Sequence, residues 1–138
     1  MSRAGAELPV IIKTYDLVLW TAQHVAKFPR GHRFTLGERL ENKLLSVLEE
    51  LIRAKFAAEK AALLRGINLE LEVLRFHFRL ASDLKCLSTE SYGFAARSVD
   101  EIGRMVGGWL KQKQGAVAYR PDHRSLQPAG GGAALVCG

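Results

Sequence analysis

A group of cations between residues 27 and 43 is the feature of this sequence that most clearly suggests a chemistry. Four of them bracket the expected start of a helix, where the helix macrodipole already disfavours positive charge. Stability alone would not select that arrangement, so the cations are candidates for binding nucleic-acid phosphates or an acidic protein surface. The group consists of Lys27, Arg30, Arg33, Arg39 and Lys43.

Other cations recur at helical spacing along the chain. Two pairs of like charges stand four residues apart, a spacing that costs about 0.2–0.5 kcal/mol per pair on a helix face. Bound phosphate would offset that cost, whereas the alternative is that nearby carboxylates neutralise each pair. The pairs are Arg39 with Lys43, near Glu38 and Glu41, and Arg75 with Arg79, near Glu72 and Asp83. A weaker series of Arg97, Arg104 and Lys111 recurs every seven residues, interrupted by Asp100 and Glu101.

No catalytic or cofactor-binding motif accompanies these cations. A di-iron bundle enzyme needs Glu-x-x-His on two helices, and neither His24 nor His77 follows a Glu by three residues. The chain contains no phosphate-binding Gly-x-x-x-x-Gly-Lys-Ser/Thr loop and no His-Glu-x-x-His zinc motif. Cys86, in an apolar helical stretch, is expected to be a buried and inert thiol, and His77 is expected to be solvated or hydrogen-bonded beside Arg75 and Arg79. The sequence therefore predicts no enzyme, no metal site and no cofactor.

The composition fits one basic domain. The chain has 138 residues, with 20 Lys and Arg against 14 Asp and Glu, which gives a net charge of +6. This excess attracts RNA, DNA or an acidic protein but does not determine a fold. The two cysteines form neither a metal-binding spacing nor a disulfide framework, so a reducing cytoplasm is expected. The first residues lack an apolar signal core, and no apolar run approaches the roughly 20 residues that span a bilayer, so we expect a soluble, unprocessed protein.

Apolar residues recur with a helical period in four blocks, and no strand signal is present. The expected fold class is all-α, with an up-down antiparallel four-helix bundle in residues 1–114. Residues 115–138 hold five of the 13 Gly and two of the four Pro, and are expected to form a flexible tail. The helices are expected at residues 9–27, 36–56, 61–87 and 88–113, with Ser88 or Thr89 as the cap of the last.

The start of the second helix has the clearest local signal. Pro29 and Gly31 interrupt the preceding helix. Thr35 and Glu38 then have the spacing of a capping box, in which each side chain satisfies an exposed amide of the first turn. The second helix is therefore expected to begin at Leu36.

The break between the second and third helices is poorly marked, because residues 57–62 contain neither Pro nor Gly. We place it at residues 57–60, since two shorter helices fit one domain better than a single long rod.

The expected core stripe of the first helix is Ile12, Tyr15, Leu19 and Ala22, widened by Ile11, Val18 and Val25. That of the second is Leu36, Leu40, Leu44, Val47, Leu48 and Leu51, with Glu49 and Arg53 as an outer ion pair. That of the fourth is Tyr92, Ala95, Val99, Ile102, Met105 or Val106, and Trp109.

The third helix carries two adjoining apolar stripes, and a single core-facing side cannot bury both. A helix in a four-helix bundle is peripheral, so the second stripe favours a contact with another subunit. The first stripe is Leu64, Ile67, Leu71, Leu74, Phe78 and Ala81, and the second is Val73, Phe76, Leu80, Leu84 and Leu87.

Aromatic residues do not alternate with the helical cations along the sequence, as a base-stacking platform would require. Any nucleic-acid contact is therefore expected to be with phosphates and largely independent of sequence.

Six segments in order resemble the accessory variability determinant (Avd) proteins of diversity-generating retroelements. The resemblance covers about residues 8–113. The segments are Lys13-Thr-Tyr-Asp-Leu-Val-Leu-Trp20, Phe28-Pro-Arg-x-x-Arg-Phe-Thr-Leu-Gly-Glu-Arg39, Leu69-Glu-Leu-Glu-x-Leu-Arg-Phe76, Leu80-Ala-x-Asp-Leu84, Phe94-Ala-Ala-Arg97 and Asp100-Glu-Ile-Gly-Arg-Met-x-Gly-Gly-Trp-Leu-Lys111. The residues from Gly115 depart from the family pattern, and no function is carried onto them.

The resemblance implies a four-helix bundle that assembles as a homopentameric barrel and has no catalytic residues. It also implies binding to the element's reverse transcriptase and, through a basic surface, to template RNA and possibly cDNA during mutagenic reverse transcription and retrohoming. The candidate residues for these contacts are Lys27, Arg30, Arg33, Arg39, Lys43, Arg75, Arg79, Arg97 and Arg104. The alternative is a structural bundle of the related ribosomal-RNA intervening-sequence type, with no direct role in nucleic-acid binding.

Overall fold

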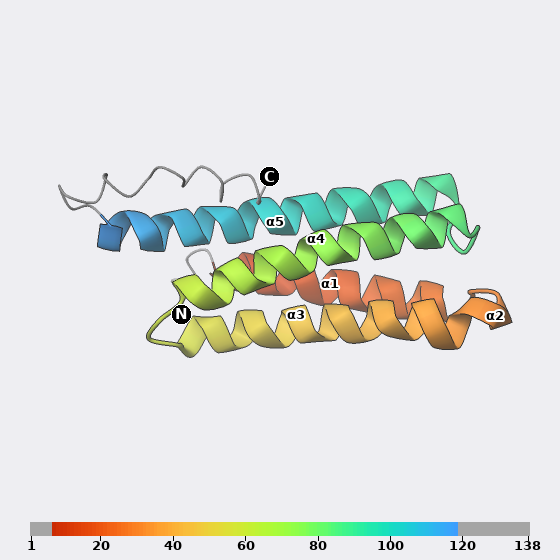
Figure 1. Ribbon diagram of the computed structural model, residues 1–138, viewed down its shortest axis with the longest axis horizontal. Coiled ribbons are helices and arrows are strands. Elements are labelled where there is room, and N and C mark those ends of the chain that lie inside the picture. The colour runs from red at the N-terminus through yellow and green to blue at the C-terminus, as the bar shows by residue number, and fades with distance from the viewer. Residues whose placement is uncertain (1–6, 119–138) are drawn as a thin grey trace.

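Four long helices form the part of the chain that the computed structural model describes, residues 7–118. They run side by side in alternating directions (Figure 1). The long helices are α1 (Glu7–Val25), α3 (Glu38–Phe56), α4 (Ala61–Asp83) and α5 (Thr89–Ala118), and the short α2 (Arg30–His32) and π-helix η1 (Arg33–Gly37) precede α3. No strand occurs in this part of the chain. The expected all-α, up-down four-helix bundle is therefore confirmed.

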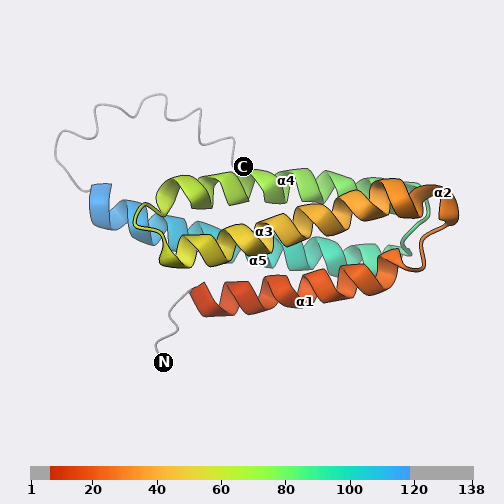
Figure 2. The same ribbon diagram turned by 90° about the horizontal axis from the view of Figure 1, so that it is seen from below.

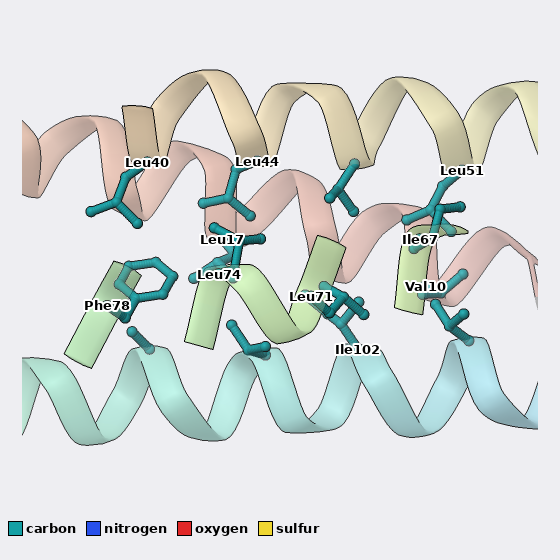
Figure 3. Packing of buried hydrophobic residues seen from close by; sticks show 14 of the residues in the cluster. Val10, Leu17, Leu40, Leu44, Leu51, Ile67, Leu71, Leu74, Phe78 and Ile102 are labelled. Atoms are coloured by element: carbon teal, nitrogen blue, oxygen red, sulfur yellow. The ribbon is translucent and has the colours of Figure 1, made fainter. Parts of the chain in front are cut away.

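The helices form a square in which α1 and α4 occupy opposite corners. Helix α1 packs against α3 and α5, and α4 packs against the same two helices. Figure 2 shows the same four rods from a second direction. The core runs along the whole bundle, and Figure 3 shows Leu17, Leu40, Leu74 and Ile102 pointing from the four helices into the space between them at successive levels. Each of these four side chains is at most 2% exposed.

Helix α1 buries a different face from the expected stripe. Ile12, Tyr15 and Leu19 are 50–58% exposed. The core instead receives Val10, Leu17 and Val25, with Thr14 and Thr21 between them. Thr14 is buried at little cost because its hydroxyl donates to the carbonyl of Val10 at 2.8 Å. Because the inner face of α1 includes two threonines, the apolar periodicity of the sequence did not identify it.

The expected capping box at Thr35 and Glu38 is wrong. The chain turns at Pro29 directly into α2, and η1 carries the helical backbone on into α3 without a free first turn. The Thr35 hydroxyl consequently donates back to the carbonyl of His32 at 3.4 Å. The π-helix also buries Leu36 and Gly37 against the bundle.

The break between α3 and α4 lies at residues 57–60, as expected. At this break a lysine, rather than Pro or Gly, ends helix α3. The ammonium of Lys60 donates to the carbonyls of Ala54 and Ala57, each at 2.8 Å, and to that of Lys55 at 3.1 Å. A cation that satisfies the last carbonyls of a helix stabilises its C-terminus.

Helix α4 ends at Asp83, before the expected end at residue 87. Lys85 adopts a left-handed backbone with φ of 64°. The amide of Cys86 donates to the carbonyl of Ala81 at 2.8 Å, and the amide of Lys85 donates to that of Ser82 at 3.0 Å. These two bonds form a Schellman motif, which usually has glycine at the left-handed position. Because this position is a lysine rather than a glycine, the sequence did not indicate that the helix ends here.

Helix α5 begins and faces inward largely as expected. The Ser88 hydroxyl accepts the amide of Ser91 at 3.0 Å, which identifies Ser88 as the cap. The core residues of α5 are Ala95, Ser98, Val99, Ile102, Val106 and Trp109. The helix continues through Gly115 to Ala118, because one glycine costs a helix only about 1 kcal/mol. Residues 119–138 lie outside the described residues, so a flexible tail there stays a prediction.

Candidate nucleic-acid interface

The outer face of α5 carries cations that are not neutralised by neighbouring carboxylates. Arg97, Arg104 and Lys111 are exposed, and none makes an ion pair with the side chains that the structure describes, those of residues 8–112. Their spacing of seven residues is close to two helical turns, so they follow one line with steps of about 10.5 Å. Asp100 and Glu101, which interrupt the series in sequence, instead pair with Arg75 of α4 and Lys13 of α1.

Some cations at residues 27–43 are exposed, and others make a hydrogen bond or an ion pair within the protein. Lys27, Arg30 and Arg39 are exposed and make no ion pair within the described residues. Arg33 is half-buried; its guanidinium donates to the carbonyl of Phe28 at 3.3 Å and lies 5.7 Å from the ring centre of Phe34. Lys43 pairs with Glu70 of α4 at 2.9 Å.

The carboxylates that neutralise these pairs differ in part from those expected. Arg75 pairs with Glu72 at 3.4 Å, as the alternative interpretation anticipated, and with Asp100 of α5 at 3.2 Å. Neither Glu38 nor Glu41 neutralises Lys43, because Glu70 occupies that role from the neighbouring helix. Arg79 is exposed and makes no ion pair in the described part of the chain. Arg53 likewise pairs with Glu50 at 2.8 Å rather than with Glu49.

Three aromatic rings meet where the end of α1 packs beside the start of α5. The rings of Trp20 and His24 stack with centroids 3.8 Å apart, and the Phe94 ring lies 5.0 Å from that of Trp20. Arg97 follows Phe94 by about one turn. Sequence reasoning missed this cluster because the aromatic residues of α1 and the cation of α5 are more than 70 positions apart. Aromatic residues and cations are therefore adjacent in space although they do not alternate in sequence.

A groove of about 900 Å³ lies between η1, α3 and the end of α4. Its walls include Phe34, Leu80 and Leu84, and its polar residues include Lys43 and His77. Desolvation lowers the pKa of His77, and the charges of Lys43 and Arg39 lower it further, against the opposing effect of Glu70. His77 thus faces α3, on a different side of α4 from Arg75, whereas it was expected on the exposed side with Arg75 and Arg79 or at its edge. Its Nδ1 is buried and has no hydrogen-bond partner among the described residues, although a solvated or hydrogen-bonded histidine was expected.

The fold and these surfaces can now be compared with known proteins. A sequence model of the bAvd-like family matches residues 10–113, which is well over half of the chain. The chain belongs to the bAvd-like family. This confirms the resemblance drawn from the six sequence segments. A comparison with curated proteins found no significant match.

The region shared with the bAvd-like family contains the whole candidate interface. It begins in the first turns of α1 and ends in α5, so it includes part or all of each long helix. All nine candidate cations of the sequence analysis lie within it. Avd-type proteins are an accessory, non-catalytic kind of protein.

Within residues 7–118, no group of three or more His, Cys, Asp or Glu side chains could hold a metal ion. In the same range, no helix has both the length and the apolar character needed to cross a membrane. Cys86 is half-buried in the turn after α4, not in a helix as expected, and burial raises the pKa of its thiol.

Proposed function

We propose that this chain is an accessory protein of a diversity-generating retroelement that binds the element's reverse transcriptase and template RNA. In this role it supports mutagenic reverse transcription and retrohoming. The observation that carries the proposal is the line of unpaired cations on α5 in a member of the bAvd-like family. Cations that face solvent without carboxylate partners are available to phosphates and release counterions when they bind.

The nucleic-acid contact uses the exposed cations rather than those in ion pairs. Arg97 and Arg104 on α5, together with Arg79 on α4, provide positive charge to an RNA strand. Arg75 instead joins α4 to α5 through Asp100, so its role is mainly structural. Contacts of this kind are with phosphates, so cDNA binds by the same chemistry as RNA.

Two exposed apolar faces support assembly as a ring of identical chains, which we propose to be the pentamer of the family resemblance. One face is on α1 and the other is on α4, at opposite corners of the bundle. Because the two faces are different surfaces, a contact between them is head-to-tail and can close into a ring. The α1 face consists of Leu8, Ile12, Tyr15 and Leu19, and the α4 face consists of Leu69, Phe76, Leu80 and Leu84.

The exposed cations before and at the start of α3 are suited to an acidic surface on the reverse transcriptase. Lys27, Arg30 and Arg39 have no carboxylate partner within the described residues, and they lie at one end of the bundle. Long-range attraction to such a cluster raises the rate of association with an oppositely charged protein.

Co-purification with the reverse transcriptase of the same element tests the proposal. We expect the wild-type chain to retain the polymerase after ribonuclease treatment and the R30Q/R39Q variant to retain much less. A matched variant, K13Q/R53Q, loses the same charge from two ion-paired cations and should behave as wild type. Loss of the polymerase from wild type after ribonuclease treatment would show that RNA alone joins the two proteins, which contradicts direct binding.

A further inference from the structure

The aromatic cluster between α1 and α5 is more exposed than core packing requires. Phe94 leaves 42% of its surface in solvent while its ring contacts Trp20. Trp20 is half-buried and stacks in turn on His24. The cluster therefore presents one open aromatic ring supported from behind by two others.

The polar groups around this ring are arranged to receive a partner. His24 uses Nδ1 to donate to the carbonyl of Trp20 at 2.9 Å, because a carbonyl can only accept. A Cβ at Gly93 would stand 3.2 Å from a terminal nitrogen of Arg97, so the Arg97 guanidinium lies back along α5 towards the residue next to Phe94.

Two exposed cations stand close to the cluster residues along the chain. Lys27 comes three residues after His24, just beyond the end of α1, and Arg97 comes three residues after Phe94 on α5. Neither makes an ion pair with the side chains described, those of residues 8–112. Lys13 and Trp20 mark the side of α1 that contacts α5. At about 100° per residue, Ile12 and Leu19 each lie about 100° around the helix from this side, so the apolar face of α1 is a separate surface from the cluster.

We propose that Phe94, supported by Trp20, stacks on an unpaired base of single-stranded nucleic acid while Arg97 binds an adjacent phosphate. The proposal rests on the RNA binding proposed above and extends it, because phosphate contacts alone would not use an aromatic ring. Stacking of bases on aromatic side chains is the common mode of single-strand recognition and tolerates any base. Double-stranded RNA keeps its bases stacked on one another, so the cluster selects unpaired segments.

Two probes of equal length and charge separate the base contact from the phosphate contacts. One is an oligouridylate, and the other is the corresponding abasic ribose-phosphate oligomer. The full chain should bind the oligouridylate more tightly, and F94L should reduce that affinity by at least about fivefold without changing the affinity for the abasic oligomer. The matched control is F56L, since Phe56 is also an exposed ring beside a cation, Lys55, but no second aromatic ring contacts it within the described residues.

Tryptophan fluorescence gives a second measurement on the same samples. The chain has two tryptophans, and Trp109 is only 2% exposed, so quenching by a bound base reports mainly on Trp20. We expect the oligouridylate to quench this emission and the abasic oligomer to leave it nearly unchanged. Circular dichroism and light scattering verify that F94L keeps its fold and assembly.

The other outcomes are distinguishable from one another. Equal weakening of both probes by F94L, or a change in assembly, would assign Phe94 to folding or to a subunit contact and overturn the base-stacking site. No change with either probe would overturn it as well. If wild type binds both probes equally, the inference fails while the proposed function stands. If wild type binds neither probe, the RNA-binding part of the proposed function fails with it.

Discussion

Gly37 occupies the point where η1 passes closest to the end of α1. A Cβ at this position would come 2.6 Å from Cγ1 of Val25, a side chain that is itself only 4% exposed. The backbone of Gly37 is in the ordinary helical region, so space rather than conformation requires glycine here. The close approach holds η1 against α1 and so positions the cations before α3.

Replacing Gly37 by alanine should therefore destabilise the protein by about 1–3 kcal/mol, the usual cost of overpacking a core. Gly108 provides the matched control, because it is exposed on α5 and nothing lies within 4 Å of its added Cβ. Gly108→Ala should stabilise by up to about 1 kcal/mol through helix propensity. Urea denaturation followed by circular dichroism measures both values. Equal effects of the two substitutions would contradict the steric role assigned to Gly37.

Individual residues also explain which parts of the structure could be predicted from sequence. The apolar periodicity of α3 and α4 was regular enough to predict their inner faces, and leucines dominate those faces. Lys85 hid a helix end because lysine rarely adopts a left-handed backbone. Thr14 hid the inner face of α1 because its hydroxyl is satisfied within its own helix. In each case a local hydrogen bond outweighed the general preference of the residue type.

At the scale of the helices, sequence periodicity revealed the second stripe of α4 but not its counterpart on α1. Glu70 of α4 pairs towards α3, and Arg75 pairs towards α5. Leu69, Phe76 and Leu80 lie between those directions and point outward. The exposure of Phe76 and Leu80 agrees with the sequence expectation that the core cannot bury both stripes, whereas Leu87 of the expected second stripe is buried in the core and Leu69 was not expected on this face. The α1 stripe was assigned to the core instead, so the existence of two separate faces emerged only from the structure.

Two helix-face variants test whether the α1 face and the α4 face bind each other. We expect I12E/L19E and L69E/F76E each to fold but to fail to assemble, because all four side chains are at least half exposed in the single chain. Mixed in equal amounts, the two variants should form a dimer and nothing larger, since each keeps one intact face. Light scattering at micromolar concentration measures the masses.

A different pairing of faces gives a different result in the same experiment. If the α1 face binds a second α1 face, L69E/F76E alone would form a dimer and the mixture would gain nothing. A wild-type chain that is monomeric would remove the basis for any ring, because its apolar faces would then remain exposed.

At the scale of the whole molecule, the cationic line of α5 lies on a different helix from the apolar faces of α1 and α4. The apolar faces lie on α1 and α4, whereas α5 carries the unpaired cations Arg97, Arg104 and Lys111 on its outer side. A net charge of +6 could not have revealed this division. The pairing of Asp100 with Arg75 and of Glu101 with Lys13 produces it, because these bridges turn the acidic groups of α5 towards neighbouring helices. The sequence could identify candidate cations for RNA binding, but the ion pairs between helices determine which of them are free to bind RNA.

A ring repeats the cationic line of α5 once per subunit. Weak phosphate contacts on several subunits then act together on one RNA strand, and the effective concentration of each further site is high. The proposed assembly and the proposed RNA binding use different faces of the same bundle, so a variant can change one without the other.

The salt dependence of template-RNA binding tests the central claim most directly. Filter binding at several salt concentrations would compare wild type, R97Q/R104Q, and K13Q/R53Q, which removes the same charge from ion-paired positions. The account predicts that R97Q/R104Q flattens the slope of log affinity against log salt by roughly 0.7–0.9 for each phosphate that is no longer neutralised, while the control keeps the wild-type slope. A wild-type slope in folded, assembled R97Q/R104Q, or an equal flattening in the control, would contradict the claim that the unpaired cations of α5 bind RNA.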